Sequence, residues 1–285
     1  MENLKELRRR IRSVESTKQI TKAMEMVSAA KLRRAQSRVE AARPYSEKLK
    51  QILSSLAGAG DIAHPLFEQR EIKNTAIVMM TSDRGLCGSY NQNVIRTVGL
   101  LLSDYAKDNV KLVLVGKRSK DYYKRRDWER RYEYLDWGGN MDFPRTQRIA
   151  AEVTDLFISG EVDKVKLVYT RFVSTTSYRV TVEDFLPISK PEATEDKQSQ
   201  DYIYEPNPES IYAEILPKFI QNRIYMAFAE ALASEHGARM ISMSNATSNA
   251  ADMIDHLTLV RNKVRQASIT SELLEIVSGA EALKG

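Results

Sequence analysis

The chain has 285 residues, of which 42% are hydrophobic and 28% are charged, and its net charge is +5. This composition excludes a disordered chain, and the single cysteine excludes an intrachain disulfide and fits a reducing compartment. No apolar run approaches the roughly 18 residues of a membrane span. Residues 1–50 hold fourteen Lys and Arg against six acids, a local charge of +8, which requires an acidic partner such as nucleic acid, lipid headgroups or another protein.

The first predicted element is a helix from about residue 3 to residue 56. Its apolar residues recur at steps of three and four, as in a coiled-coil seam: Leu4, Leu7, Ile11 and Val14. The repeat is expected to break near Lys18, to resume at Ile20, Met24 and Val27, and to shift again before Leu32. Such interruptions loosen a supercoil locally. Pro44 removes one hydrogen-bond donor and is expected to kink the helix.

The middle of the chain alternates strand and helix patterns. Strands are predicted at 75–82, 111–116, 132–137, 165–172 and 178–186, and helices at 89–108, 119–126 and 145–159. This alternation favours a Rossmann-like, mostly parallel α/β domain. Residues 187–201 are polar and proline-rich, so we expect a mobile loop there.

The last predicted element is a second long helix, capped by Asn207, with Pro208 in its first turn, a bend at Pro217 and a stop at Gly279. Its apolar ladder also has coiled-coil spacing: Ala246, Ala250, Met253, Leu257, Val260, Val264 and Ala267. At 1.5 Å per residue this helix is about 105 Å long, too long for a compact domain of this mass. The sequence therefore predicts a long antiparallel coiled coil of residues 1–57 and 207–285, with the α/β domain, residues 58–206, inserted between them.

Motifs for chemistry are weak. The glycine-containing turn at residues 82–89 could face a phosphate, but it lacks the dinucleotide fingerprint and Asp83 would repel an anion. Residues 116–119 only partly match a P-loop. No Cys/His cluster suggests a metal, and Cys87 has no nearby histidine in sequence. We expect no catalytic residue, metal or cofactor. Two alternatives stay open: a nucleotide-dependent α/β enzyme with a coiled-coil arm, and a basic coiled-coil protein that binds nucleic acid or lipid.

Four segments resemble the gamma subunit of rotary (F-type) ATP synthases: residues 20–27 (ITKAMEMV), 82–88 (SDRGLCG), 201–206 (DYIYEP) and 265–280 (RQASITSELLEIVSGA). Their order agrees with that family along the whole chain. Chloroplast relatives carry an insert with a regulatory cysteine pair, which is missing here. With no transit-type sequence, the resemblance favours a bacterial protein.

The resemblance implies a non-catalytic rotor subunit in the central stalk of a proton-translocating ATP synthase. Its partners would be the alpha and beta subunits, the epsilon subunit and the membrane c-ring, and not nucleic acid. It would be a peripheral protein at the cytoplasmic face of the bacterial plasma membrane, associated with the membrane only through the complex.

The resemblance also implies roles for individual residues. Contacts with the stator would come from Arg8, Arg9, Arg10, Met24, Arg33, Arg34, Arg265, Gln266 and Thr270. The tip that turns in an apolar bearing would be Ile276, Val277, Ala280 and Leu283. The foot, on the side of the c-ring and epsilon, would include Tyr204 and Glu205.

Overall fold

The computed structural model describes residues 4–58, 64–136, 143–175, 177–189 and 207–282. The chain divides into two compact units. The first consists of residues 1–28 and 240–285, and the second of residues 29–239. Both long helices contribute to both units.

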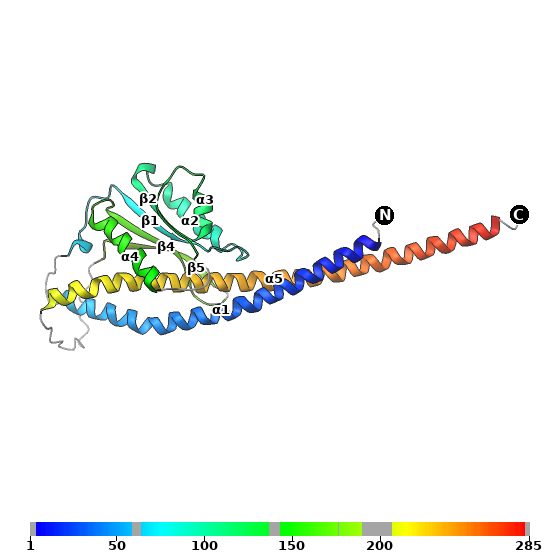
Figure 1. Cartoon of the computed structure of the whole chain (residues 1–285), viewed down its shortest axis with the longest axis horizontal. Helices are drawn as coiled ribbons and strands as arrows, with labels where there is room; N and C mark the ends of the chain where they lie inside the picture. The colour runs from blue at the N-terminus through cyan, green and yellow to red at the C-terminus, as the bar shows by residue number, and fades with distance from the viewer. Residues whose placement is uncertain (1–3, 59–63, 137–142, 176, 190–206, 283–285) are drawn as a thin grey trace. The chain divides into compact units, whose positions relative to one another are not determined.

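The two predicted long helices are present as α1 (Leu4–Gly58, 55 residues) and α5 (Pro208–Ala282, 75 residues). They pack against each other in each unit. In the first unit the Thr247 hydroxyl donates to that of Thr21 at 2.8 Å. In the second unit Ser46 donates to Asn222, and a Cβ at Gly237 would lie 4.0 Å from the Leu32 side chain. The earlier residue of α1 thus meets the later residue of α5, so the predicted antiparallel pairing is confirmed there (Figure 1).

The predicted break in the α1 repeat is wrong. The least exposed positions continue at steps of three and four through the whole helix: 4, 7, 11, 14, 18, 21, 25, 28, 32, 35, 39, 42, 46, 49 and 53. Ile20 and Val27, which were expected on the seam, are 57% and 56% exposed. Thr21 and Ser28 are buried in their place, because their hydroxyls donate to the carbonyls of Lys18 and Met24. A small, hydrogen-bonded polar side chain can occupy a seam that a hydrophobicity pattern assigns to its apolar neighbour.

The α5 ladder is correct at only some of its steps. Ala250 is buried and Leu257 and Val264 are half-buried as predicted, but Met253 is 53% exposed and Ala267 is also exposed. Ala246 and Val260 are half-buried as predicted, and the seam also includes Thr247, Ile254, Arg261 and Ser268, which the ladder left out. The seam thus includes three polar residues, Thr247, Arg261 and Ser268, which an apolar pattern cannot identify.

The second unit contains a five-stranded sheet of order β3-β2-β1-β4-β5. Its strands are β1 (Thr75–Met80), β2 (Val110–Val115), β3 (Glu129–Tyr134), β4 (Lys164–Phe172) and β5 (Tyr178–Leu186). The first four strands are parallel and β5 is antiparallel to β4. The predicted mostly parallel sheet is confirmed, and its central strand β1 is buried along its whole length.

Alternate side chains of the sheet enter two apolar layers. On one face Ile77 and Met79 of β1 pack with α2 (Tyr90–Leu102) and with Tyr123 of α3 (Lys117–Tyr123). On the other face Ala76 and Val78 pack with α4 (Phe143–Ile158), the C-terminal part of α1 and the N-terminal part of α5. The beginning of α5 is therefore part of the core of the α/β unit.

Short 3-10 helices, η1 (Pro65–Phe67) and η2 (Lys107–Asn109), complete the elements. Asn207 caps α5 as predicted, since its Oδ1 accepts from Ser210 N at 2.8 Å. The expected stop at Gly279 is wrong, because α5 continues to Ala282. Helix α2 ends at Leu102, earlier than predicted. Most of the loop predicted at 187–201 lies outside the described residues.

Candidate functional site

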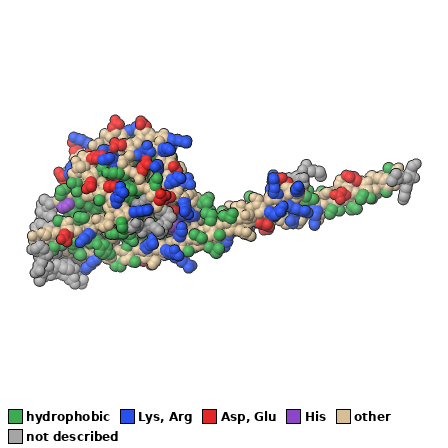
Figure 2. All heavy atoms as spheres, in the orientation of Figure 1, with side chains coloured by type: hydrophobic (Ala, Val, Ile, Leu, Met, Phe, Trp, Pro, Cys, Tyr) green, Lys and Arg blue, Asp and Glu red, His purple; other side chains and the backbone are tan. Residues whose placement is uncertain are grey.

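The predicted stator-contact arginines of α1 are on its surface. Arg9 and Arg10 both pair with Glu6, at 2.8 and 3.6 Å, and Arg8 is exposed beside them. Figure 2 shows a cluster of Lys and Arg side chains near the beginning of the chain. Arg33 and Arg34 are also exposed, in the second unit. Because the pairs with Glu6 are solvent-exposed and local, they stabilise the helix only weakly and leave the cations available to a partner.

Met24 lies on an apolar stripe of α1 that the seam does not use. Ile20, Met24 and Val27 are spaced at i, i+4 and i+7, so they share one face of the helix. Met24 is half-buried, while Ile20 and Val27 are exposed. The sequence pattern placed Ile20 and Val27 on the coiled-coil seam, and it therefore missed them as part of this surface.

The last turns of α5 carry a group of exposed apolar side chains. Every described position from 271 to 282 is exposed, and Ile276 and Val277 are 67% and 58% exposed. The predicted tip residue Ala280 lies on this segment, whereas Leu283 is outside the described residues. Ile269, Leu273 and Leu274 add further exposed apolar surface that sequence reasoning did not assign to the tip. Contiguous apolar surface of this kind marks an interaction site.

Arg265, Gln266 and Thr270 precede this segment and are exposed. The Thr270 hydroxyl donates to the Gln266 carbonyl at 2.9 Å, a hydrogen bond inside the helix. The side chains of Arg265 and Gln266 make no hydrogen bond or ion pair within the described residues, so their donors and acceptors are available to another protein. The predicted foot residues Tyr204 and Glu205 lie outside the described residues.

The turn after β1 is closed by its own side chains. Asp83 Oδ1 accepts from the backbone N–H of Lys117 at 2.9 Å, at the beginning of α3, and Asn91 Oδ1 accepts from Ser82 N. These two side chains occupy the amides of Lys117 and Ser82, and the Asp83 carboxylate would repel a phosphate beside them. Gly116 has φ of 93°, and a Cβ there would lie 2.1 Å from the Thr81 carbonyl oxygen. Gly116 thus satisfies a backbone constraint, which argues against the nucleotide-binding alternative.

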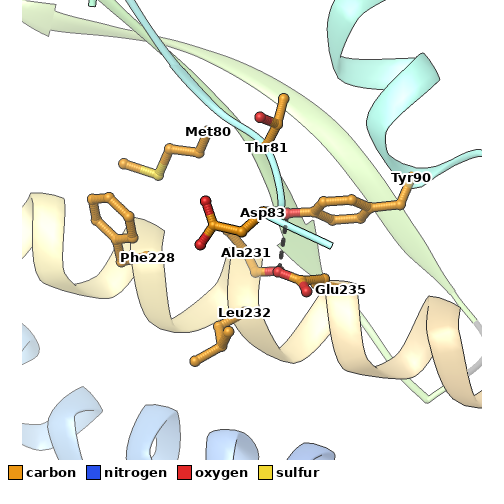
Figure 3. A pocket seen from close by; sticks show the side chains of 8 residues that line it. All are labelled: Met80, Thr81, Asp83, Tyr90, Phe228, Ala231, Leu232 and Glu235. Carbon is orange, nitrogen blue, oxygen red and sulfur yellow. Dashed lines mark hydrogen bonds between the residues drawn. The ribbon is translucent and has the colours of Figure 1, made fainter. Parts of the chain in front are cut away.

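A cavity of about 20 Å³ lies between this turn and α5 (Figure 3). It is lined by Met80, Thr81, Asp83, Tyr90, Phe228, Ala231, Leu232 and Glu235. The Tyr90 hydroxyl donates to the Ala231 carbonyl at 3.1 Å, which ties α2 to α5. The volume is that of about one water molecule, far below the 300 Å³ or more typical of small-molecule sites. The cavity cannot hold a substrate.

Beside the cavity, Arg239 joins α5 to the same turn. Its guanidinium pairs with Glu235 at 2.7 Å and donates to the Gly85 carbonyl at 3.2 Å. Burial raises the pKa of Glu235, and the nearby Arg239 opposes that rise. Burial, with the positive charges of Arg239 and Lys31, lowers the pKa of His236 to about 4. His236 is therefore neutral at physiological pH, and the cluster is a structural ion pair.

The remaining chemical possibilities have no support in the described part of the chain. Cys87 is buried, and its Sγ is 3.1 Å from the Asn91 amide nitrogen. Burial raises the pKa of its thiol, which favours the unreactive protonated form. Among the residues described, no three His, Cys, Asp or Glu side chains are grouped so as to bind a metal ion, and none of the helices has the length and apolar character needed to cross a bilayer.

Comparison with known proteins identifies the family. The profile of a family described as ATP synthase matches residues 3–283. The ATP synthase gamma chain of Protochlamydia amoebophila is 45% identical over 285 residues, with 100% of both chains covered. That of Nitratidesulfovibrio vulgaris is 47% identical over 291 residues, again with 100% of both covered. The chain belongs to the ATP synthase gamma chain family.

Solved structures agree with this membership. A chain from the central stalk and c-ring structure of the Tetrahymena thermophila mitochondrial ATP synthase has a TM-score of 0.63 and 26% identity, with 80% of this chain and 99% of that chain covered. A chain of the Euglena gracilis mitochondrial ATP synthase has a TM-score of 0.71 and 22% identity, over 98% and 94% of the two chains, and shares the fold. The gamma chain resemblance noted in four sequence segments is thus confirmed.

Proposed function

We propose that the chain is the central-stalk rotor subunit of a proton-translocating ATP synthase. The observation that carries the proposal is the end of α5, where exposed apolar residues continue beyond the last half-buried seam position, Ser268. When no part of the same chain packs against the apolar surface of a helix, that surface indicates contact with another protein. The bore of a hexamer of alpha and beta subunits provides such a surface. Apolar contact has little directionality, so the helix can turn within it.

The rotor performs no bond chemistry. Proton flow turns the c-ring, the ring turns this chain, and each beta subunit meets a different face of the helix pair in turn. The faces differ: α1 presents arginines and the stripe of Ile20, Met24 and Val27, whereas α5 presents Arg265, Gln266 and Thr270. A shaft with different faces has different contact free energies with the conformations of each beta subunit, and only such a difference can shift their populations.

The charged contacts in this proposal are individually weak. Arg8, Arg9, Arg10, Arg33 and Arg34 would meet acidic side chains of the stator through exposed pairs of about 0–1 kcal/mol each. Weak pairs suit contacts that have to break in every rotation. Arg265, Gln266 and Thr270 would form hydrogen bonds with a beta subunit at one rotor angle, and Ile276, Val277, Ala280 and Leu283 would form the bearing tip.

Residues 1–57 and 207–285 are in this proposal the two strands of the axle, and residues 58–206 are the α/β domain. Tyr204 and Glu205 would lie at the foot, beside the c-ring and the epsilon subunit. The complex would place the chain at the cytoplasmic face of a bacterial plasma membrane as a peripheral protein. The closed turn after β1 supports a mechanical role for the α/β domain over a nucleotide-dependent enzyme.

Met24→Lys tests the proposal. A lysine at this position would pair with acidic stator groups at one rotor angle, and about 1 kcal/mol of added contact is roughly a fivefold bias among angles. We expect the ratio of ATP-driven proton pumping to ATP hydrolysis to fall in membrane vesicles that contain the complex.

Met26→Lys is the matched control, because Met26 is 60% exposed and lies off the stripe of Met24. Its ratio should stay close to that of the wild type. A normal ratio in the Met24→Lys complex would refute the assigned contact, and a complex that couples fully without this chain would refute the rotor function.

A further inference from the structure

The edge strand β5 contains an irregularity where it meets α5. Val165 of β4 pairs with Leu186, but the next residue, Lys166, pairs with Asp184. Phe185 therefore has no partner across the ladder and forms a β-bulge. Bulges leave backbone groups without ladder hydrogen bonds and are often placed where a strand meets a functional element.

Arg223 of α5 binds this bulge. Its Nη1 donates to the Phe185 carbonyl at 3.0 Å, and its Nη2 donates to the Asp184 carbonyl at 3.1 Å and to the Glu183 carboxylate. The planar guanidinium can serve three acceptors at once, which an ammonium on a flexible stem cannot do in the same geometry.

Aromatic rings enclose the same guanidinium. Its carbon atom is 4.8 Å from the centroid of the Phe185 ring and 5.9 Å from that of Phe219, one turn earlier on α5. The Arg223 side chain is only 19% exposed. Partial burial strengthens the charged hydrogen bonds and the cation–π contacts relative to those at an open surface.

The two acidic residues of this segment, Glu183 and Asp184, are also bound by side chains of β4. The Tyr169 hydroxyl of β4 donates to Glu183 Oε2 at 3.4 Å, while Glu183 Oε1 accepts from Arg223. Asp184 is fixed by Lys164 and Lys166 at 2.9 and 2.8 Å. The segment from Glu183 to Phe185 is thus bound on one side by β4 and on the other by α5.

We propose that Arg223 and the bulge of β5 form a mechanical joint that makes the sheet and α5 turn as one body. The inference rests on the proposed rotor function and adds to it a positioning residue. Torque that enters through the α/β domain has to reach α5. Near the turn after β1, the hydrogen bonds of Tyr90 and Arg239 tie the domain to this helix. Beside β5, apolar packing without Arg223 would leave the helix less resistant to sliding along the sheet. Directional hydrogen bonds to two carbonyls and a carboxylate resist that sliding.

Arg223→Met tests the joint, because methionine keeps an apolar stem over Phe185 and removes the charged fork. Arg179→Met is the matched control: Arg179 is an exposed arginine of the same strand, and its side chain makes no hydrogen bond or ion pair among the described residues. Glu183→Gln is a second variant, used also if the Arg223→Met complex does not assemble. Each is measured in the assembled complex, by hydrogen exchange of β5 and by the ratio of proton pumping to ATP hydrolysis.

We expect exchange of the β5 amides to accelerate roughly ten- to hundredfold in Arg223→Met, and the pumping ratio to fall, with Arg179→Met unchanged in both. Arg223→Lys should restore part of the ratio. Faster exchange of the β5 amides with a normal pumping ratio would mean that the contact is only structural, and this would overturn the inference. Unchanged exchange together with an unchanged pumping ratio would also overturn it. A complex that is assembled without this chain and still couples proton flow to ATP hydrolysis would instead refute the proposed rotor function.

Discussion

At the residue scale, the turn between β2 and α3 shows how backbone geometry dictates one amino acid. Gly116 has a positive φ, and its position against the Thr81 carbonyl leaves no room for a Cβ. Thr81 Oγ1 in turn accepts from Ser119 N at 2.9 Å, so the close approach is fixed by hydrogen bonds on both sides. The sequence shows glycine at position 116 but cannot distinguish a phosphate cradle from a packing constraint, and only the contacts decide between them.

Gly116→Ala is expected to destabilise the second unit by about 3 kcal/mol or more, because alanine is strained at this φ and collides with the backbone. Gly99→Ala is the control: Gly99 lies in α2, and the Cβ of an alanine there would have no neighbouring atom within 4 Å, so alanine should stabilise the chain by about 0.5–1 kcal/mol. Denaturant unfolding measures both. Equal effects of the two substitutions would contradict this account of Gly116.

At the element scale, the seam of the first unit combines apolar and polar steps in one unbroken repeat. Leu7 and Ile11 of α1 are buried, and Thr21 continues their repeat through its hydrogen bond with Thr247. The apolar pattern predicted the helix and its partner correctly, but it chose Ile20 over Thr21. Hydrophobicity alone favours the larger apolar residue, Ile20. The geometry of a regular helix pair instead favours Thr21, because position 21 continues the three- and four-residue spacing of the seam.

Ile11→Ala and Ile20→Ala test this register with the same chemical change. Ile11 is buried, so its truncation should cost about 2–5 kcal/mol of helix-pair stability. Ile20 is largely exposed, so its truncation should change stability by no more than about 0.5 kcal/mol. Hydrogen exchange of residues 4–28 reports the local stability of this pair. A comparable loss from both substitutions would mean that Ile20 belongs to the seam.

At the scale of the whole molecule, the chain has a part that its own contacts do not stabilise. Described positions 269–282 of α5 are all exposed, and an isolated helix of about this length is marginal in water. In the proposed function, the alpha and beta subunits of the complex pack around that segment. Its stability thus depends on assembly rather than on the fold of the chain.

We therefore expect the amides of residues 269–282 to exchange rapidly in the isolated chain and to become protected in the assembled ATP synthase. The amides of β1, which is buried along its length, should be protected in both and serve as the internal control. The same rapid exchange of residues 269–282 in both samples would mean that nothing encloses this part of α5.

The two long helices, their antiparallel pairing, the mostly parallel sheet and the family were all predictable from the amino-acid sequence, because strong periodicity and long signature segments are local properties of the chain. The tertiary structure decided which residue occupies each seam step, which carbonyls Arg223 binds at the Phe185 bulge, and that Asp83 closes the turn after β1. These depend on contacts between residues far apart in sequence, whose geometry and hydrogen bonding no local pattern contains.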